Sequence, residues 1–298
     1  MAEGKWLTGL TPDQDAVEAG QQILENRFGM LIRSVEKLEA EDPGEAIHQL
    51  RVGTRRAEAA VRLLQPCLRP KIYRATRALL RSMRQAAGDV RDTDVLLTQV
   101  QQQLANADAK EQPGLELFLG HLLGQRVESE ANLLRLPPEQ MEAALERALA
   151  GLRAADPETF GPLARAALRK AVRRFNKTLQ ADTEDEANLH RTRIAGKRLR
   201  YVVELTGPCL DSTLVEEMYP RLEALQEMLG RVNDSHNALD RLIPFYQALP
   251  LLGEQAAAHY RPGLEELHAE HVQRLKVERE AFESWLAAWQ EAAVPAFA

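Results

Sequence analysis

The order of apolar and polar residues along the 298-residue chain is typical of amphipathic helices. Ala, Leu, Glu, Gln and Arg dominate the sequence, and these residues are strong helix formers. No alternating run of β-branched residues bounded by turn signals appears, so the pattern does not favour strands. We therefore predict an all-α fold.

Clusters of Gly, Pro and Asp divide the predicted helices. In the first half they stand at Asp42-Pro43-Gly44, Pro66 to Pro70, Gly88-Asp89, Gln112-Pro113-Gly114 and Pro137-Pro138. In the second half they stand at Asp156-Pro157, Gly161-Pro162, Asp182 to Asp185, Gly207-Pro208, Gly230 to Asp234 and Arg261-Pro262-Gly263. This spacing predicts about four to six helices per half, and short connections favour antiparallel neighbours in a bundle.

The two halves share a residue pattern at an offset of 142. His48-x-x-Arg51-Val52 recurs as His190-x-x-Arg193-Ile194, and Pro66-Cys67-Leu68 recurs as Pro208-Cys209-Leu210. The same offset relates Gly88-x-Val90-x-Asp92-Thr93 to Gly230-x-Val232-x-Asp234-Ser235. We interpret this register as a tandem duplication with its boundary between Gly151 and Pro162. The prediction is two helical bundles, residues 1–155 and residues 156–298.

Composition places the chain among ordinary globular proteins. Hydrophobic residues make up 45% and charged residues 28%, which argues against a disordered or collagen-like chain. No window approaches the ~20 consecutive apolar residues that a transmembrane helix needs. The first residues, Met1 to Trp6, show neither a signal core nor an Arg-rich transit pattern, so we expect a cytoplasmic protein. Cys67 and Cys209 form no CxxC motif, and we expect small buried residues rather than a disulfide framework or a zinc site.

The formal net charge of −6 hides two strongly basic segments. Residues 48–91 carry eleven Lys or Arg and two acids, and residues 161–200 carry eleven and four. The rest of the chain is therefore strongly acidic. Such segregation focuses positive potential at one place and keeps the remaining surface soluble, which indicates a compact anion or an anionic chain as the partner.

Helical spacing gathers the basic residues on one face. Around His48, the side chains of Arg51, Arg55 and Arg62 fall within about 60°. The opposite face is apolar and consists of Leu50, Ala57, Val61 and Leu64. The second half repeats the basic face with His190, Arg193, Lys197 and Tyr201, with Arg200 at its edge. The next helix of the first half adds a further basic stripe, which consists of Arg74, Arg77, Arg81 and Arg84. In the second half, the residues at the same offset are Glu216, Tyr219, Glu223 and Gln226, so this stripe is not repeated.

A solvated face is the ordinary explanation for such a stripe. Three observations favour an anion site instead. Acids that could pair with the cations at i,i+4 spacing are scarce, so the like charges repel. Arg outnumbers Lys ten to one in residues 48–91, and its planar fork suits phosphate oxygens. The pattern also occurs twice in the chain.

Other chemistry finds less support in the sequence. His48 and His190 could ligate a metal with Asp92, Asp234 or His236, but the flanking arginines would repel a cation. A histidine-dependent phosphohydrolase or phosphotransferase would lack a Walker loop, a kinase motif and paired carboxylates for magnesium. Asp92 and Asp234 follow glycine breaks, and we interpret them as helix N-caps. Tyr201 could donate to a phosphate or serve as a packed aromatic residue, and both interpretations stay open.

The chain contains two His-x-x-Arg segments, His48-Gln-Leu-Arg51-Val-Gly-Thr-Arg55-Arg56 and His190-x-x-Arg193-Ile-Ala-Gly-Lys197-Arg198-Leu-Arg200-Tyr201. A Gly-x-Val-x-Asp element follows each segment. Together these motifs resemble the CHAD family of histidine-containing α-helical domains. The resemblance covers nearly the whole chain. It implies two helical bundles related by a pseudo-two-fold axis around a basic central cleft. It also implies binding of inorganic polyphosphate, often with association to polyphosphate granules. Because motifs for catalysis are missing from the sequence, we expect neither an enzyme nor a cofactor.

The resemblance and the basic stripes together give a set of expected ligand-binding residues. They are His48, Arg51, Arg55, Arg56, Arg74, Arg77, Arg81, His190, Arg193, Lys197, Arg198, Arg200 and Tyr201, joined from the preceding helices by Arg27, Arg169 and Arg173. A nucleic-acid-binding protein is the alternative from another class. Against it, aromatic residues are only 5% of the chain, and few of them interleave with the basic segments to stack on bases.

Overall fold

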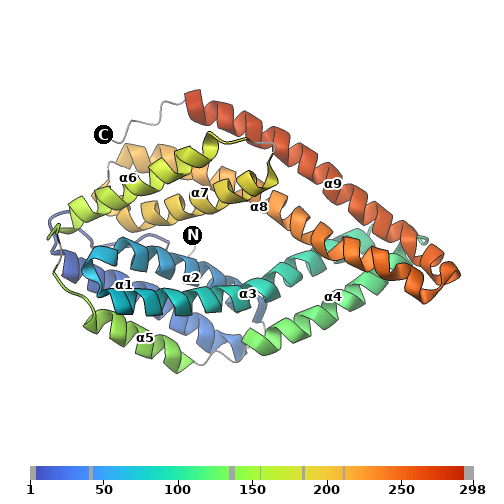
Figure 1. The fold of residues 1–298 in the computed structure, drawn as a ribbon, viewed down its shortest axis with the longest axis horizontal. Helices are drawn as coiled ribbons and strands as arrows, with labels where there is room; N and C mark the ends of the chain where they lie inside the picture. Colours follow the sequence, from blue (N-terminus) through green and yellow to red (C-terminus); the bar gives the residue numbers. More distant parts are fainter. Residues whose placement is uncertain are drawn as a thin grey trace.

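The computed structural model describes residues 5–39, 43–133, 138–154, 156–182, 185–210 and 212–291, and these residues form an all-α fold (Figure 1). Strands are absent from this part of the chain, which confirms the predicted fold class. The α-helices are α1 (Ala16–Glu36), α2 (Pro43–Leu63), α3 (Pro70–Leu104), α4 (Gln112–Leu133), α5 (Pro138–Ala150), α6 (Phe160–Leu179), α7 (Glu186–Thr206), α8 (Ser212–Ala248) and α9 (Glu254–Glu291). Short 3₁₀ turns, η1 to η4, cover Lys37–Glu39, Gln65–Cys67, Gly207–Cys209 and Leu249–Leu252.

Local chemistry explains where several helices begin. The Asp15 side chain accepts hydrogen bonds from the backbone N–H groups of Val17 and Glu18 and so caps α1. Asp185 caps α7 in the same way through the N–H of Ala187. Proline at the first position of α3 fits because this position needs no intrahelical donor. The prolines of η2 and η3 mark the predicted breaks after α2 and α7.

Three of the predicted breaks are wrong. Helices α3, α8 and α9 continue through Gly88-Asp89, through Gly230 to Asp234 and through Arg261-Pro262-Gly263. A single glycine costs a helix only about 1 kcal/mol, which strong neighbouring helix formers and tertiary packing can offset. Gly263 serves a helix crossing, because a Cβ at this position would overlap the backbone carbonyl oxygen of Glu111 at the start of α4.

The element bounds repeat at the offset found in the sequence. Shifted by 142 residues, the start of α3 coincides with the start of α8, and η2 coincides with η3. Shifted α2 would span 185–205, and α7 spans Glu186–Thr206. The duplication stays a prediction, and these bounds agree with it.

Buried side chains form three apolar clusters. The first joins α1, α2, the start of α3 and α5 to residues of α6 and α7, among them Phe160 and Tyr201. The second joins α6, α7 and the first part of α8 to the end of α9 around Phe175 and Phe282. The apolar face predicted for the segment after His48 is confirmed, because its four members are buried: Leu50, Ala57, Val61 and Leu64.

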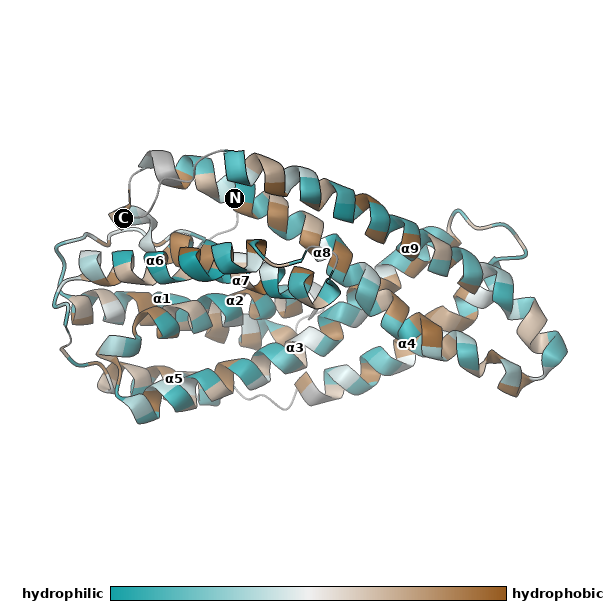
Figure 2. Ribbon diagram, turned by 45° about the horizontal axis from the view of Figure 1, so that its top comes forward, coloured by the Kyte–Doolittle hydropathy of each residue, from teal (hydrophilic) through white to brown (hydrophobic). Residues whose placement is uncertain are grey.

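The third cluster was not anticipated from the sequence. It lies where the far ends of α3 and α8 meet α4 and the start of α9, and Phe118 and Leu242 belong to it (Figure 1). Apolar and polar residues are interspersed along these helices (Figure 2), and the apolar members of this cluster are buried. Because both parts of the chain supply this cluster, the division into residues 1–155 and 156–298 stays a prediction. Within the described residues, no helix combines the length and apolar character that a membrane span requires.

A buried ion pair joins α2 to α7. The Arg56 Nε atom donates to Glu204 Oε2 over 2.8 Å, and the two side chains are 7% and 0% exposed. The Tyr219 hydroxyl donates to the other carboxylate oxygen over 2.7 Å. These bonds satisfy a carboxylate that would otherwise be buried without compensation. Arg56 therefore holds two helices together, and we leave it out of the binding site considered below.

We expect Glu204→Gln to destabilise the fold by roughly 3–5 kcal/mol, because it leaves the Arg56 charge buried without its partner. Urea unfolding followed by circular dichroism measures the change. Glu217→Gln, at an exposed position on α8, is the control and should change stability by less than about 0.5 kcal/mol. Equal stability of the two variants would contradict the assignment.

Candidate functional site

A cavity of about 640 Å³ lies between the first and second parts of the chain. Helices α2 and α3 line one wall, and α6 and α7 line the other. At ~30 Å³ per molecule, this volume corresponds to roughly 20 waters. The cavity therefore has room for a solute larger than a single phosphate group.

The cavity lining is strongly basic. The α2 and α3 wall carries Arg55, Arg62, Arg77 and Arg84, and the α6 and α7 wall carries Lys170, Arg174, Arg193, Lys197 and Arg198. Glu58 is the single acid among the described lining residues. Six of the nine cations have no ion-pair partner in the described part of the chain: Arg55, Lys170, Arg174, Arg193, Lys197 and Arg198.

The basic residues of the two walls lie close enough to repel one another. Burial and the charges of Arg55, Arg193 and Arg51 lower the pKa of Lys197 to about 5. Burial and the charge of Arg62 likewise lower the pKa of Arg198. Since Arg55 and Arg62 belong to α2 while Lys197 and Arg198 belong to α7, the two basic faces meet across the cavity. An anion placed between them would relieve this repulsion.

Arg193 is the most buried cation of the lining. Its side chain is 8% exposed, and its Nε atom has no hydrogen-bond partner in the described structure. Burial, followed by the charge of Arg55, lowers the pKa of Arg193 to about 10. A buried donor without a partner costs on the order of 1–3 kcal/mol, which a bound anion could recover.

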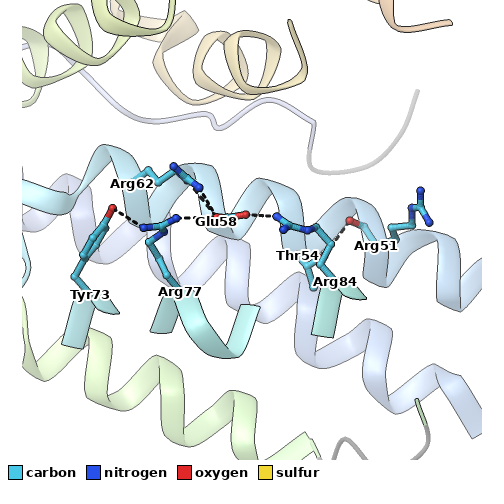
Figure 3. A network of polar contacts seen from close by, with 7 residues as sticks. All are labelled: Arg51, Thr54, Glu58, Arg62, Tyr73, Arg77 and Arg84. Atoms are coloured by element: carbon cyan, nitrogen blue, oxygen red, sulfur yellow. Dashed lines mark hydrogen bonds and ion pairs between the residues drawn. The ribbon is translucent and has the colours of Figure 1, made fainter. Parts of the chain in front are cut away.

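Glu58 gathers three arginines on the α2 and α3 wall (Figure 3). Arg62 donates to Glu58 Oε1 over 2.6 Å, Arg77 donates to the same oxygen over 3.3 Å, and Arg84 donates to Oε2. Burial alone would raise the pKa of Glu58, but the hydrogen bonds and charges of these arginines hold it below the ordinary value. The carboxylate is therefore ionised at neutral pH.

Arg51 contacts α3 just outside the cavity lining. Its Nη1 atom donates to the Gly88 carbonyl over 3.0 Å and to Asp92 Oδ1 over 2.7 Å. Asp92 and Asp234 were predicted to be helix N-caps, and this is wrong because they lie inside α3 and α8. Asp92 instead pairs with Arg51, and Asp234 lies near Arg193, the residue at the matching offset.

The two predicted histidines occupy different places. His190 lines the cavity, whereas His48 is half-buried outside its lining. Burial and the charge of Arg91 lower the pKa of His48, and burial and the charge of Arg193 lower the pKa of His190. Both imidazoles are thus mostly neutral at pH 7. Among the described residues, no three His, Cys, Asp or Glu side chains are arranged to hold a metal ion.

Seven of the predicted site residues line the cavity: Arg55, Arg77, His190, Arg193, Lys197, Arg198 and Tyr201. Tyr201 also belongs to the first apolar cluster, with its ring centroid 5.2 Å from the Arg200 Cζ atom. Arg200 and Arg51 are half-buried beside the site, and Arg27 is a core residue whose Nη2 donates to the Lys5 carbonyl. The remaining four are exposed outside the lining: Arg74, Arg81, Arg169 and Arg173.

Sequence reasoning missed two cations of α6. Lys170 and Arg174 line the cavity, one position after the predicted Arg169 and Arg173. The useful signal is the run of small residues on the same face, Ala166, Ala167 and Ala171, because short side chains leave space beside the basic ones. Arg62 and Arg84 belonged to the predicted stripes but not to the expected ligand set, and both line the cavity.

Comparison with solved structures places this arrangement among known folds. The crystal structure of the CHAD domain from the plant Ricinus communis aligns with a TM-score of 0.72 and 26% identity, covering 94% of each chain. PptA from Streptomyces chartreusis aligns with a TM-score of 0.69 and 19% identity, covering 93% of this chain and all of the other. A search among curated proteins gave no match.

The family model for the CHAD domain matches residues 22–243. This range includes α2, α3, α6 and α7, which form both walls of the basic cavity. With the match extending over most of the sequence, the chain belongs to the CHAD domain family.

Proposed function

We propose that this protein binds inorganic polyphosphate in the cavity between α2, α3, α6 and α7, without catalysing a reaction on it. The observation that carries the proposal is that nine Lys and Arg side chains and a single acid are among the described residues that line the two facing walls. Polyphosphate has about one negative charge per unit, so one chain can neutralise several of these cations at once. Association with polyphosphate granules would follow from the same binding and belongs to the proposal.

The expected energetics resemble those of proteins that bind nucleic-acid backbones. Each charge-assisted hydrogen bond between arginine and phosphate contributes ~1.5–3 kcal/mol in a partly desolvated site. Binding also releases counterions condensed on the polyanion, so affinity falls steeply as salt rises. Helix packing holds the basic residues of the cavity together before the ligand binds. Mobile cations in solution lack this fixed arrangement and therefore cannot replace these residues as partners of the polyanion.

Calorimetric titration with polyphosphate at several salt concentrations tests the proposal. We expect a linear fall of log K with log salt. Competition with single-stranded RNA at equal phosphate concentration distinguishes polyphosphate binding from nucleic-acid binding, which is the main alternative. Displacement of polyphosphate by RNA would favour a nucleic-acid-binding protein. Release of phosphate with added divalent metal, lost in His48→Ala or His190→Ala, would instead show a hydrolase or phosphotransferase.

Neighbouring basic residues of α6 differ in whether they line the cavity, and this difference gives a testable prediction. Charge reversal in Lys170→Glu/Arg174→Glu should weaken polyphosphate binding by at least ~100-fold, because each lost contact corresponds to about tenfold or more in affinity. The titration above measures the change.

The matched control is Arg169→Glu/Arg173→Glu, which makes the same charge change one position away on α6, at side chains that are likewise exposed but do not line the cavity. Screening over about 8 Å at physiological salt should limit its effect to a small fraction of that seen for the cavity variant. Equal losses in both variants would mean that general charge, and not the cavity, governs binding.

We predict that polyphosphate binding is accompanied by proton uptake at Lys197. Its pKa of about 5 in the free protein leaves the amine neutral at pH 7, and a neighbouring polyanion raises this pKa. Between the free and bound pKa values, affinity therefore falls as pH rises, and binding at pH 7 takes up about one proton at this site. Titration in buffers of different ionisation enthalpy measures the uptake.

Lys197→Arg provides the comparison, because arginine stays charged in both states. We expect this variant to bind polyphosphate with less proton uptake than the unaltered protein. The same uptake in both proteins would exclude Lys197 as the proton acceptor.

A further inference from the structure

Glu58 occupies the α2 and α3 wall much as a bound anion would. Its side chain is 9% exposed, and each of its oxygens accepts hydrogen bonds from arginine (Figure 3). Arg62 reaches it from the same helix, whereas Arg77 and Arg84 reach it from α3. Three guanidinium groups around one oxyanion group is an arrangement that phosphate groups also accept.

The opposite wall has no such internal anion. No acid of α6 or α7 is among the described residues that line the cavity. An incoming anion therefore meets cations of two kinds. Lys170 and Arg174 are available at once, while the arginines around Glu58 are already paired.

The two kinds of cation are neighbours. Besides burial, the charges of Arg62, Glu58, Arg174 and Arg84 shift the pKa of Arg198 on α7, so Arg198 lies near cations of both kinds. An anion bound at the α6 and α7 wall that extends past Arg198 comes next to the Glu58 cluster. This placement makes the length of the anion decisive.

We propose that Glu58 is an internal competitor that selectively lowers the affinity of the site for long polyphosphate, while the affinity for short polyphosphate is nearly unaffected. The inference rests on the proposed function. Short anions bind the α6 and α7 wall and leave Glu58 paired. Long chains also contact Arg62, Arg77 and Arg84, and they must first take these arginines from Glu58.

The competition has a cost and a gain. Displacing Glu58 removes charge-assisted hydrogen bonds and leaves a carboxylate near a polyanion, so a single phosphate contact does not offset it. Several successive phosphates of one chain do offset it, because the later contacts are intramolecular and carry little further association entropy. Glu58 thus reduces the affinity of long chains without preventing their contact with its wall.

The test compares tripolyphosphate with long-chain polyphosphate in titrations of the full chain. Glu58→Gln removes the competing charge and keeps the side-chain shape, so long-chain affinity should rise about tenfold and tripolyphosphate affinity less than about threefold. Asp94→Asn is the matched control, because Asp94 lies on α3 outside the cavity lining and pairs with Arg126 of α4. It should change neither affinity.

A second variant keeps the inference falsifiable if Glu58→Gln folds poorly. Arg84→Gln should lower long-chain affinity and leave tripolyphosphate affinity unchanged. If either variant shifts both ligands by the same factor, Glu58 has a structural role only, and the inference is overturned while polyphosphate binding stands. If the unaltered protein binds neither ligand, the proposed function fails as well.

Discussion

Repulsion between like charges across one cavity is the constraint on which the rest of the structure depends. Besides burial, the charges of Arg55 and Arg51 on α2 lower the pKa of Lys197 on α7, so the basic residues of the two parts lie near one another. Within the described lining, Glu58 pairs with three arginines of its own wall, but no acid bridges the two walls. The apolar clusters on either side and the buried Arg56–Glu204 pair hold the walls together, and the packing energy of the helices keeps the charged walls in place.

Much of the fold could be predicted because helix periodicity is a local property. The apolar side of α2 and the breaks at Pro66 and Pro208 follow from nearby residues alone. The breaks at Gly88, Gly230 and Gly263 could not be judged in this way, because helix packing decides whether a glycine ends a helix. At Gly263 the deciding contact is with Glu111, far away in the sequence.

The sequence was sufficient to predict which helix faces form the candidate site. It was less informative about which individual residues line the cavity. Arg55, Arg193 and Lys197 follow from the repeated motif, and they line the cavity. Arg56 is adjacent in sequence to Arg55 but is turned into the core toward Glu204, a partner that only tertiary structure reveals. Glu58 was counted as one acid among many cations, and its pairing with Arg77 and Arg84 depends on how α3 crosses α2.

The Arg56–Glu204 pair also constrains how the protein is made. The two residues are 148 positions apart, and the first apolar cluster includes Phe160, Tyr201 and Leu205 from later in the chain. While the ribosome is still synthesising α7, the helices already released have a guanidinium without its carboxylate and a core without several of its side chains. The early part of the nascent chain therefore reaches its final packing only after the later part has emerged.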